Sequence, residues 1–325
     1  MVGNKCPNHQ KEPEIIEEEN YFFKLSKYAN QIKKEISADK IKIIPLARKN
    51  EILRFIDQGI EDVSCSRSKN NLEWGIPVPG DSSQIIYIWF EALINYLFPK
   101  NYWPADVHCV GKDILRFHAL LWSAMLIAVD LKRPKTILVH GFITSGGQKM
   151  SKSLGNVVDP FGLVDEYGAD AVRYFLLREI PSTEDGDFTL EKFKVRYNAD
   201  LANGLGNFAA RVSALKNQFL EFKPLKIGKA IGKEIEKTKK TAAKKLEEFK
   251  FNESLAAIWG LIAFGDKYIN QTQVWKIQNP KSKFQIISNL LVILNAVAML
   301  LTPFLPETSA KIARLKKGEI LFPRR

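Results

Sequence analysis

The pattern of apolar and polar residues changes twice along the chain. Up to about residue 66, acidic runs alternate with apolar residues at helical spacing, which predicts a small helical or mixed module. From Gln84 onward, β-rich runs alternate with segments of helical character, and the runs read IIYIWF, DVHCVG and TILVHGFIT. Strands that alternate with helices favour a parallel sheet. From Asn198 to the end, every long segment has helical periodicity, which predicts an all-α domain.

Two local signals refine this outline. Asp159 followed by Pro160 is typical of a helix start, because aspartate caps the first free N–H groups and proline fits the first helical position. The apolar stretch 286–305 is long enough to raise the question of a membrane span. It contains Ser288, Asn289, Asn295 and a proline, so a buried helix is the better interpretation. We expect no membrane association.

Composition and charge narrow the classes of function. The 325 residues predict two or three cooperating units, and the 46% apolar and 26% charged shares are those of a soluble globular protein. The net charge of +12 favours a polyanionic partner or substrate. The lysine-biased stretch 223–250 is better explained as an exposed amphipathic helix than as a dedicated phosphate-binding strip. Three scattered cysteines and a polar N-terminal stretch predict a cytoplasmic protein without a disulfide framework.

The segment 145–156, SGGQKMSKSLGN, lies between a predicted strand and a predicted helix. Glycines let the backbone turn sharply, while Lys149, Lys152, Ser151 and Ser153 supply mobile donors for phosphate oxygens. ATP is the obvious ligand, since stabilising the charge that builds up on a reacting triphosphate is mainly an electrostatic task. An ordinary glycine- and lysine-rich surface loop is the alternative explanation.

Residues 149–153 match the KMSKS signature of class I aminoacyl-tRNA synthetases letter for letter. Three flanking segments resemble the methionine-specific family in particular. They read WGIPVPGD at 74–81, IYIWFEALINY at 86–96 and VGKDILRFHALLWSAML at 110–126. The resemblance implies a methionine-tRNA ligase that forms methionyl-adenylate from methionine and ATP with Mg²⁺, then transfers methionine to tRNA(Met).

The same resemblance implies roles for individual residues. The lysine and serine side chains of the signature would be catalytic. ATP would be bound by Gly111, Asp113, His140 and Lys152, with Asp113 on the adenosine ribose. The methionine pocket would be walled by Trp89, Ala92, Tyr96, Ile114 and His118. Aromatic walls suit a thioether, because sulfur packs favourably against ring edges.

The helical part also resembles this family. The segment 196–216 is similar to the helix that begins the family's anticodon-binding domain, and it places Asn207 and Arg211 toward the anticodon. Asparagine and arginine read base edges, and arginine also stacks on exposed bases. The segment 266–280 is similar to one that carries a tryptophan, so Trp275 would stack on an anticodon base. The alternative for Trp275 is packing at a helix junction.

The sequence departs from the family pattern at its N-terminal side. The family's HIGH motif needs two histidines three apart, and no pair among the four histidines has that spacing. We therefore expect the first half of the sheet to come from a separate N-terminal chain in trans or to have been lost. Cys6 and His9 resemble half of a zinc knuckle, which would bind Zn²⁺ only if a partner supplied the other two ligands.

The predicted architecture is α/β plus all-α, with the second half of a class I Rossmann-like parallel sheet. Residues 1–75 would be the remainder of a connective-peptide insertion, 76–142 the second half of the catalytic domain, 143–196 the KMSKS and stem-contact region, and 197–325 a helical anticodon-binding domain. Two other hypotheses stay open: a truncated, non-catalytic tRNA-binding module, and a class I synthetase of the leucine or isoleucine type.

Overall fold

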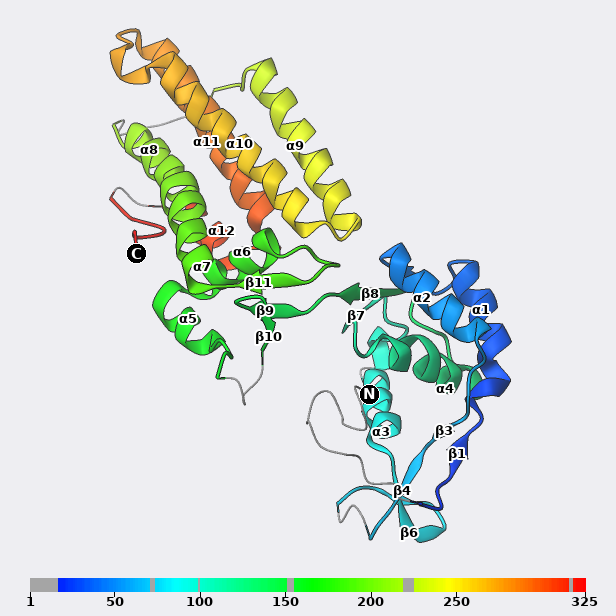
Figure 1. Ribbon diagram of the computed structural model, residues 1–325. Coiled ribbons are helices and arrows are strands. Elements are labelled where there is room, and N and C mark those ends of the chain that lie inside the picture. The colour runs from blue at the N-terminus through cyan, green and yellow to red at the C-terminus, as the bar shows by residue number, and fades with distance from the viewer. Residues whose placement is uncertain (1–16, 71–73, 99, 151–154, 219–224, 316–317) are drawn as a thin grey trace. The chain divides into compact units, whose positions relative to one another are not determined.

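The computed structural model describes residues 17–70, 74–98, 100–150, 155–218, 225–315 and 318–325, and it divides the chain into two compact units. The first unit comprises residues 1–139 and the second comprises residues 140–325. The first carries most of the β-structure, while the second is dominated by long helices (Figure 1).

The first unit is built on a three-stranded sheet in the order β2-β8-β7. The bounds are Lys42–Ile44 for β2, Val107–Gly111 for β7 and Thr136–His140 for β8, and β2 runs parallel to β8. Helices α1 (Ala29–Ser37) and α2 (Leu46–Asp57) share a buried apolar cluster with this sheet. The expectation of a parallel sheet is confirmed. The sheet takes strands from both sides of residue 75, and the predicted domain boundaries stay predictions.

The rest of the first unit consists of short strands and an aromatic-rich helical layer. A short helix, η1, spans Leu25–Tyr28. The antiparallel pairings are β1 (Phe22–Phe23) with β3 (Val63–Ser64), and β6 (Asp81–Ile86) with both β4 (Ser66–Ser68) and β5 (Pro77–Val78). The helical layer contains α3 (Ile88–Ile94), η2 (Asn95–Leu97), η3 (Lys100–Tyr102), the π-helix Phe117–Trp122 and α4 (Ser123–Ala128).

One expected strand is wrong in its second half. The run IIYIWF predicts a strand over residues 85–90, but β6 ends at Ile86 and α3 begins two residues later. Trp89, Phe90 and Leu93 recur at helical spacing and pack together with Trp122 in an apolar cluster. Burial of these side chains on one helical face therefore overrides the strand preference of the aromatic and β-branched residues.

The second unit begins with a three-stranded sheet in the order β10-β9-β11. A hairpin joins β9 (Ile143–Ser145) to β10 (Gln148–Lys149), and β11 (Gly186–Phe188) pairs with β9 in parallel. The hairpin turn consists of Gly146 and Gly147, whose φ angles of 60° and 75° suit glycine. Asp159 caps α5 (Pro160–Tyr167) by accepting bonds from the N–H groups of Phe161 and Gly162, which confirms the predicted helix start.

The remainder of the second unit is helical, as the periodicity predicts. Its helices are α6 (Ala169–Glu179), α7 (Leu190–Arg196), a π-helix (Tyr197–Gly206), α8 (Asn207–Lys216), α9 (Lys229–Glu247), α10 (Phe251–Thr272), η7 (Val274–Lys276), α11 (Pro280–Leu301) and α12 (Pro306–Ala313). Helix α11 is long and apolar enough to cross a membrane, and 61% of its most apolar window is buried among its neighbours. The prediction of a buried helix is confirmed for α11.

Two glycines on α10 offer a matched test of packing in this bundle. A Cβ at Gly265 would lie 2.5 Å from the ring of Phe208, whereas a Cβ at Gly260 would meet nothing within 4 Å. We expect Gly265→Ala to destabilise the protein by about 1–3 kcal/mol through overpacking. Gly260→Ala should instead stabilise it by up to about 1 kcal/mol, because alanine favours the helix. Urea unfolding of both variants checks this, and equal effects would contradict it.

Candidate active site

The first unit holds a cluster of aromatic side chains at the predicted methionine site. Trp89 and Ala92 lie on α3, Tyr96 follows in η2, and Ile114 and His118 come from the segment after β7. Tyr96 Oη lies 2.9 Å from His118 Nε2, and the rings of Trp89 and His118 stand edge to face at 6.5 Å. The structure therefore brings three of the five predicted side chains together. Ile114 contributes its carbonyl oxygen, 3.0 Å from His118 Nδ1, and Ala92 is exposed.

The hydrogen bonds of His118 show which of its ring nitrogens carries a hydrogen and in which direction Tyr96 donates. The carbonyl of Ile114 can only accept, so His118 Nδ1 carries a hydrogen. Burial lowers the pKa of His118, which keeps the ring neutral near pH 7 and leaves Nε2 with a lone pair. Tyr96 consequently donates its hydroxyl proton to His118, and its oxygen lone pairs remain free to accept.

Two further aromatic residues of this cluster were not predicted from the sequence. Phe117 stacks on Trp89 with ring centroids 4.0 Å apart and an interplanar angle of 9°. His108 contacts Tyr96 edge to face at 4.3 Å, and burial lowers its pKa to about 4. Phe117 directly precedes His118 in the family-like block, so its position offered a signal. His108 lies on β7, and only tertiary packing reveals its place beside Tyr96.

The predicted ATP residues lie where strands end. Gly111 closes β7 and accepts a bond from the N–H of Ile114 at 3.1 Å, while Asp113 is exposed in the following turn. His140 closes β8, is exposed, and its Nδ1 lies 2.8 Å from the carbonyl oxygen of Gly141. The carboxyl ends of strands in open α/β sheets are the usual place for nucleotide binding. The roles of these residues stay predictions.

The lysine loop begins as a well-defined hairpin in the second unit. Lys149 is exposed on β10, and its ammonium lies 4.7 Å from the ring centroid of Phe142, a cation–π distance. Asn156 donates to the carbonyl oxygen of Lys149 at 3.2 Å. The other predicted catalytic residues, Ser151, Lys152 and Ser153, lie outside the described residues.

Asp187 on β11 holds the turn of this hairpin, and sequence reasoning missed it. One carboxylate oxygen accepts from the Gly147 N–H at 2.7 Å and from the Thr144 hydroxyl at 2.9 Å. The other accepts from Lys192 Nζ at 3.1 Å. These bonds, led by that from Gly147, lower the pKa of Asp187, so the carboxylate stays ionised at neutral pH.

The predicted anticodon residues lie in the helical part of the second unit. Asn207 is exposed at the start of α8, and Trp275 is 55% exposed in η7. Arg211 is engaged within the protein: it donates to Asp266 Oδ1 and to Asn270 Oδ1, both at 2.7 Å. Exposure of Trp275 fits base stacking better than helix-junction packing, while the base-reading roles of all three residues stay predictions.

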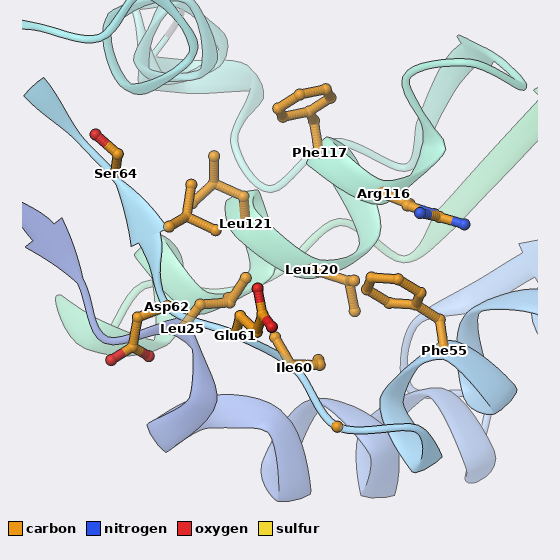
Figure 2. A pocket seen from close by; sticks show the side chains of 12 residues that line it. Leu25, Phe55, Ile60, Glu61, Asp62, Ser64, Arg116, Phe117, Leu120 and Leu121 are labelled. Carbon is orange, nitrogen blue, oxygen red and sulfur yellow. The ribbon is translucent and has the colours of Figure 1, made fainter. Parts of the chain in front are cut away.

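A separate apolar pocket of about 560 Å³ lies in the first unit, between the segment 59–64 and the π-helix. Figure 2 shows Phe55 and Arg116 side by side at one end, and the Arg116 guanidinium lies 4.2 Å from the ring centroid of Phe55. The pocket is lined by none of the residues that the sequence predicts for methionine, ATP or anticodon binding. Phe117 lines it and also stacks on Trp89.

No cluster of three or more metal-ligating side chains occurs among the described residues. Cys6 and His9, the predicted half of a zinc knuckle, lie outside that part of the chain.

Comparisons with known proteins decide the family. A family model described as "tRNA synthetases class I (M)" matches residues 1–213, and an "Anticodon-binding domain of tRNA ligase" model matches residues 228–323. The chain belongs to the methionyl-tRNA synthetase family. This confirms the predicted class I fold with a helical anticodon-binding domain, and it excludes membership of the leucine- or isoleucine-type families.

Individual members of the methionyl-tRNA synthetase family are similar over nearly the whole chain. The methionine–tRNA ligase of Caldanaerobacter subterraneus subsp. tengcongensis is 38% identical over 100% of this chain, and the match covers 58% of that ligase. The methionine–tRNA ligase of Clostridium acetobutylicum is 40% identical over 100% of this chain, and the match covers 57% of that ligase. The Mycobacterium tuberculosis methionyl-tRNA synthetase in complex with methionyl-adenylate matches with a TM-score of 0.86 and 34% identity, covering 95% of this chain and 67% of that one. The chain thus spans somewhat over half the length of these curated relatives.

Proposed function

We propose that the chain is the C-terminal portion of a methionine-tRNA ligase. The observation that carries this proposal is the 38–40% identity to methionine–tRNA ligases over the full chain. In this reaction the carboxylate of methionine attacks the α-phosphate of ATP bound with Mg²⁺, and pyrophosphate leaves. A hydroxyl of the terminal adenosine of tRNA(Met) then attacks the activated carbonyl, and AMP leaves.

The residues divide these tasks between the two units. Trp89, Tyr96 and His118 would hold the thioether side chain of methionine, with Ala92 and Ile114 completing the wall. Ribose and base contacts would come from Gly111, Asp113 and His140. Lys149 and Lys152, with the hydroxyls of Ser151 and Ser153, would stabilise charge on the triphosphate, because ammonium groups neutralise developing negative charge at little geometric cost.

The aromatic cluster offers ring edges against which the thioether of methionine can pack. An unbranched thioether fits a slot between rings, and sulfur gains about 0.3–1.5 kcal/mol at a ring edge. The stacked pair of Trp89 and Phe117 and the edge-on ring of His118 provide such edges. Tyr96 donates its proton to His118, so it offers methionine the face or edge of its ring and no hydrogen bond to the sulfur.

We further propose that catalysis requires a HIGH-bearing half of the active site in addition to these 325 residues. The four histidines of this sequence lack the required spacing, and the relatives are longer than this chain. Anticodon recognition would use Asn207, Arg211 and Trp275, with Arg211 pre-oriented by Asp266 and Asn270.

The test is methionine-dependent ATP–pyrophosphate exchange by the chain mixed with an N-terminal half that carries HIGH. Exchange that requires both chains supports the proposal, and an inactive, soluble and verified complex contradicts it. The alternative, a non-catalytic tRNA-binding module, predicts tRNA(Met) binding without exchange under the same conditions.

A further inference from the structure

Five lysines of α9 form a continuous line along the helix. Positions 229, 233, 237, 240 and 244 follow one another at intervals of three or four residues, which places them on one face. We call these five residues the lysine stripe. The buried positions of the helix lie on the opposite face: Ile231, Ile235, Thr238 and Ala242. Figure 1 shows α9 packed along α10, so the stripe faces away from the core of the bundle.

The charges of the stripe are only partly compensated within the protein. Lys237 pairs with Glu234 at 3.3 Å, and Lys244 reaches Glu248 at 4.0 Å. The other three members, at 229, 233 and 240, are exposed and form no ion pair with any described residue, although Lys240 is near enough to Glu236 to help lower the pKa of that carboxyl. Like charges three or four residues apart on a helix repel one another and destabilise it. A bound polyanion would convert this repulsion into attraction.

The stripe starts at the end of the bundle that carries Trp275. Just before α9, the carbonyl of Lys226 accepts a bond from Gln285 Nε2 at 2.8 Å, and the Gly228 N–H donates to Asn289 Oδ1 at 3.1 Å. Both partners belong to the first half of α11, which begins a few residues after η7. At about 1.5 Å per helical residue, the stripe extends roughly 22 Å from that end.

Contrary to the merely solvated helix that the sequence favours for residues 223–250, we propose that the lysine stripe binds the phosphate backbone of tRNA along the anticodon stem. Lysines are flexible point charges that follow a phosphate chain without reading bases, so this contact adds affinity and orientation but no sequence preference. The inference rests on the proposed function, because it takes tRNA as the polyanion. It goes beyond that function by assigning a role to a helix that carries none of the predicted anticodon residues.

The test compares two triple variants of the 325-residue chain. Lys229→Gln, Lys233→Gln and Lys240→Gln together remove the three charges of the stripe that form no ion pair with a described residue. The matched control is Lys34→Gln, Lys40→Gln and Lys132→Gln, three exposed lysines of the first unit that make no ion pair with described residues. The dissociation constant for a tRNA(Met) transcript is measured against salt concentration for both variants and for the unsubstituted chain.

We expect the stripe variant to lower the slope of log affinity against log salt by about 2–3, since each phosphate contact contributes roughly 0.7–0.9. Affinity near 0.1 M salt should fall at least about tenfold. The loss should be equal for a transcript with an altered anticodon, because the phosphates are unchanged. Thermal unfolding should show no destabilisation, since the substitution relieves repulsion between lysines.

A stripe variant that keeps the salt slope and affinity of the control overturns the proposal, as does a loss confined to the transcript with the methionine anticodon. If the unsubstituted chain itself fails to bind tRNA at low salt, the proposed function fails, and this proposal falls with it. Binding of tRNA by the unsubstituted chain therefore tells whether the proposed function has failed or only the proposal for the lysine stripe.

Discussion

Replacing Lys149 with methionine lowers kcat for ATP–pyrophosphate exchange by about 10²–10³ in the enzyme assembled with its HIGH-bearing half. We expect this loss because, in the proposed function, the Lys149 ammonium stabilises the negative charge that builds up on the triphosphate during the reaction. Methionine keeps an unbranched stem that can still pack on Phe142, so the ring that Lys149 contacts at 4.7 Å keeps a neighbour. Steady-state exchange kinetics with varied ATP provide the measurement.

Lys132→Met is the control for this substitution, because Lys132 is exposed and makes no ion pair among the described residues. It removes the same charge from the first unit and should leave exchange within about twofold. If both variants retained full exchange, Lys149 would have no part in catalysis. A rise in KM for ATP at constant kcat would show that Lys149 binds the ground state and the transition state equally.

The second large effect is expected at Asp187. Asp187→Ala removes the acceptor for the Gly147 N–H and the Thr144 hydroxyl, and so frees the turn from which Lys149 extends. Misplacing a reacting group by about 1 Å can cost about 100-fold in rate. We expect a fall of this size in kcat/KM for ATP, with methionine affinity unchanged because the aromatic cluster lies in the other unit.

Lys192→Ala tests whether Asp187 acts by holding the Gly147 turn or only through its ion pair with Lys192. It removes only the 3.1 Å contact to Asp187 and leaves the bond from Gly147 in place, so activity should stay near that of the unsubstituted enzyme. Asp187→Asn should fall between the two, since an amide oxygen can still accept from Gly147. Equal losses in Lys192→Ala and Asp187→Ala would contradict a role for the Gly147 bond.

The relation between sequence and structure differs from one element to the next. The cap formed by Asp159 was predictable because it depends on groups two and three residues apart. The glycine turn before Lys149 was predictable for the same reason. The helix over residues 88–94 was not, because Trp89 and Leu93 pack in an apolar cluster whose other fully buried members, Leu121, Trp122 and Leu126, lie about thirty residues away.

The candidate site shows the same division. His118 and Tyr96 were identified from family-like motifs, but their hydrogen bond and the direction of its proton depend on the backbone of Ile114. Arg211 was predicted to read a base, whereas its two hydrogen-bond partners on α10 lie more than fifty residues further along the chain. Contacts across such distances carry no local sequence signal.

The sequence by itself determined the class of protein, the alternation of strands and helices, the lysine loop and most of the residues that we assign to methionine and ATP. Each of these depends on neighbours within one motif or one helical turn. Tertiary structure alone decided the carboxylate of Asp187 beneath the glycine turn, the place of His108 beside Tyr96, and the outward direction of the lysine stripe. These features arise where distant segments pack together, and packing is a property of the folded chain.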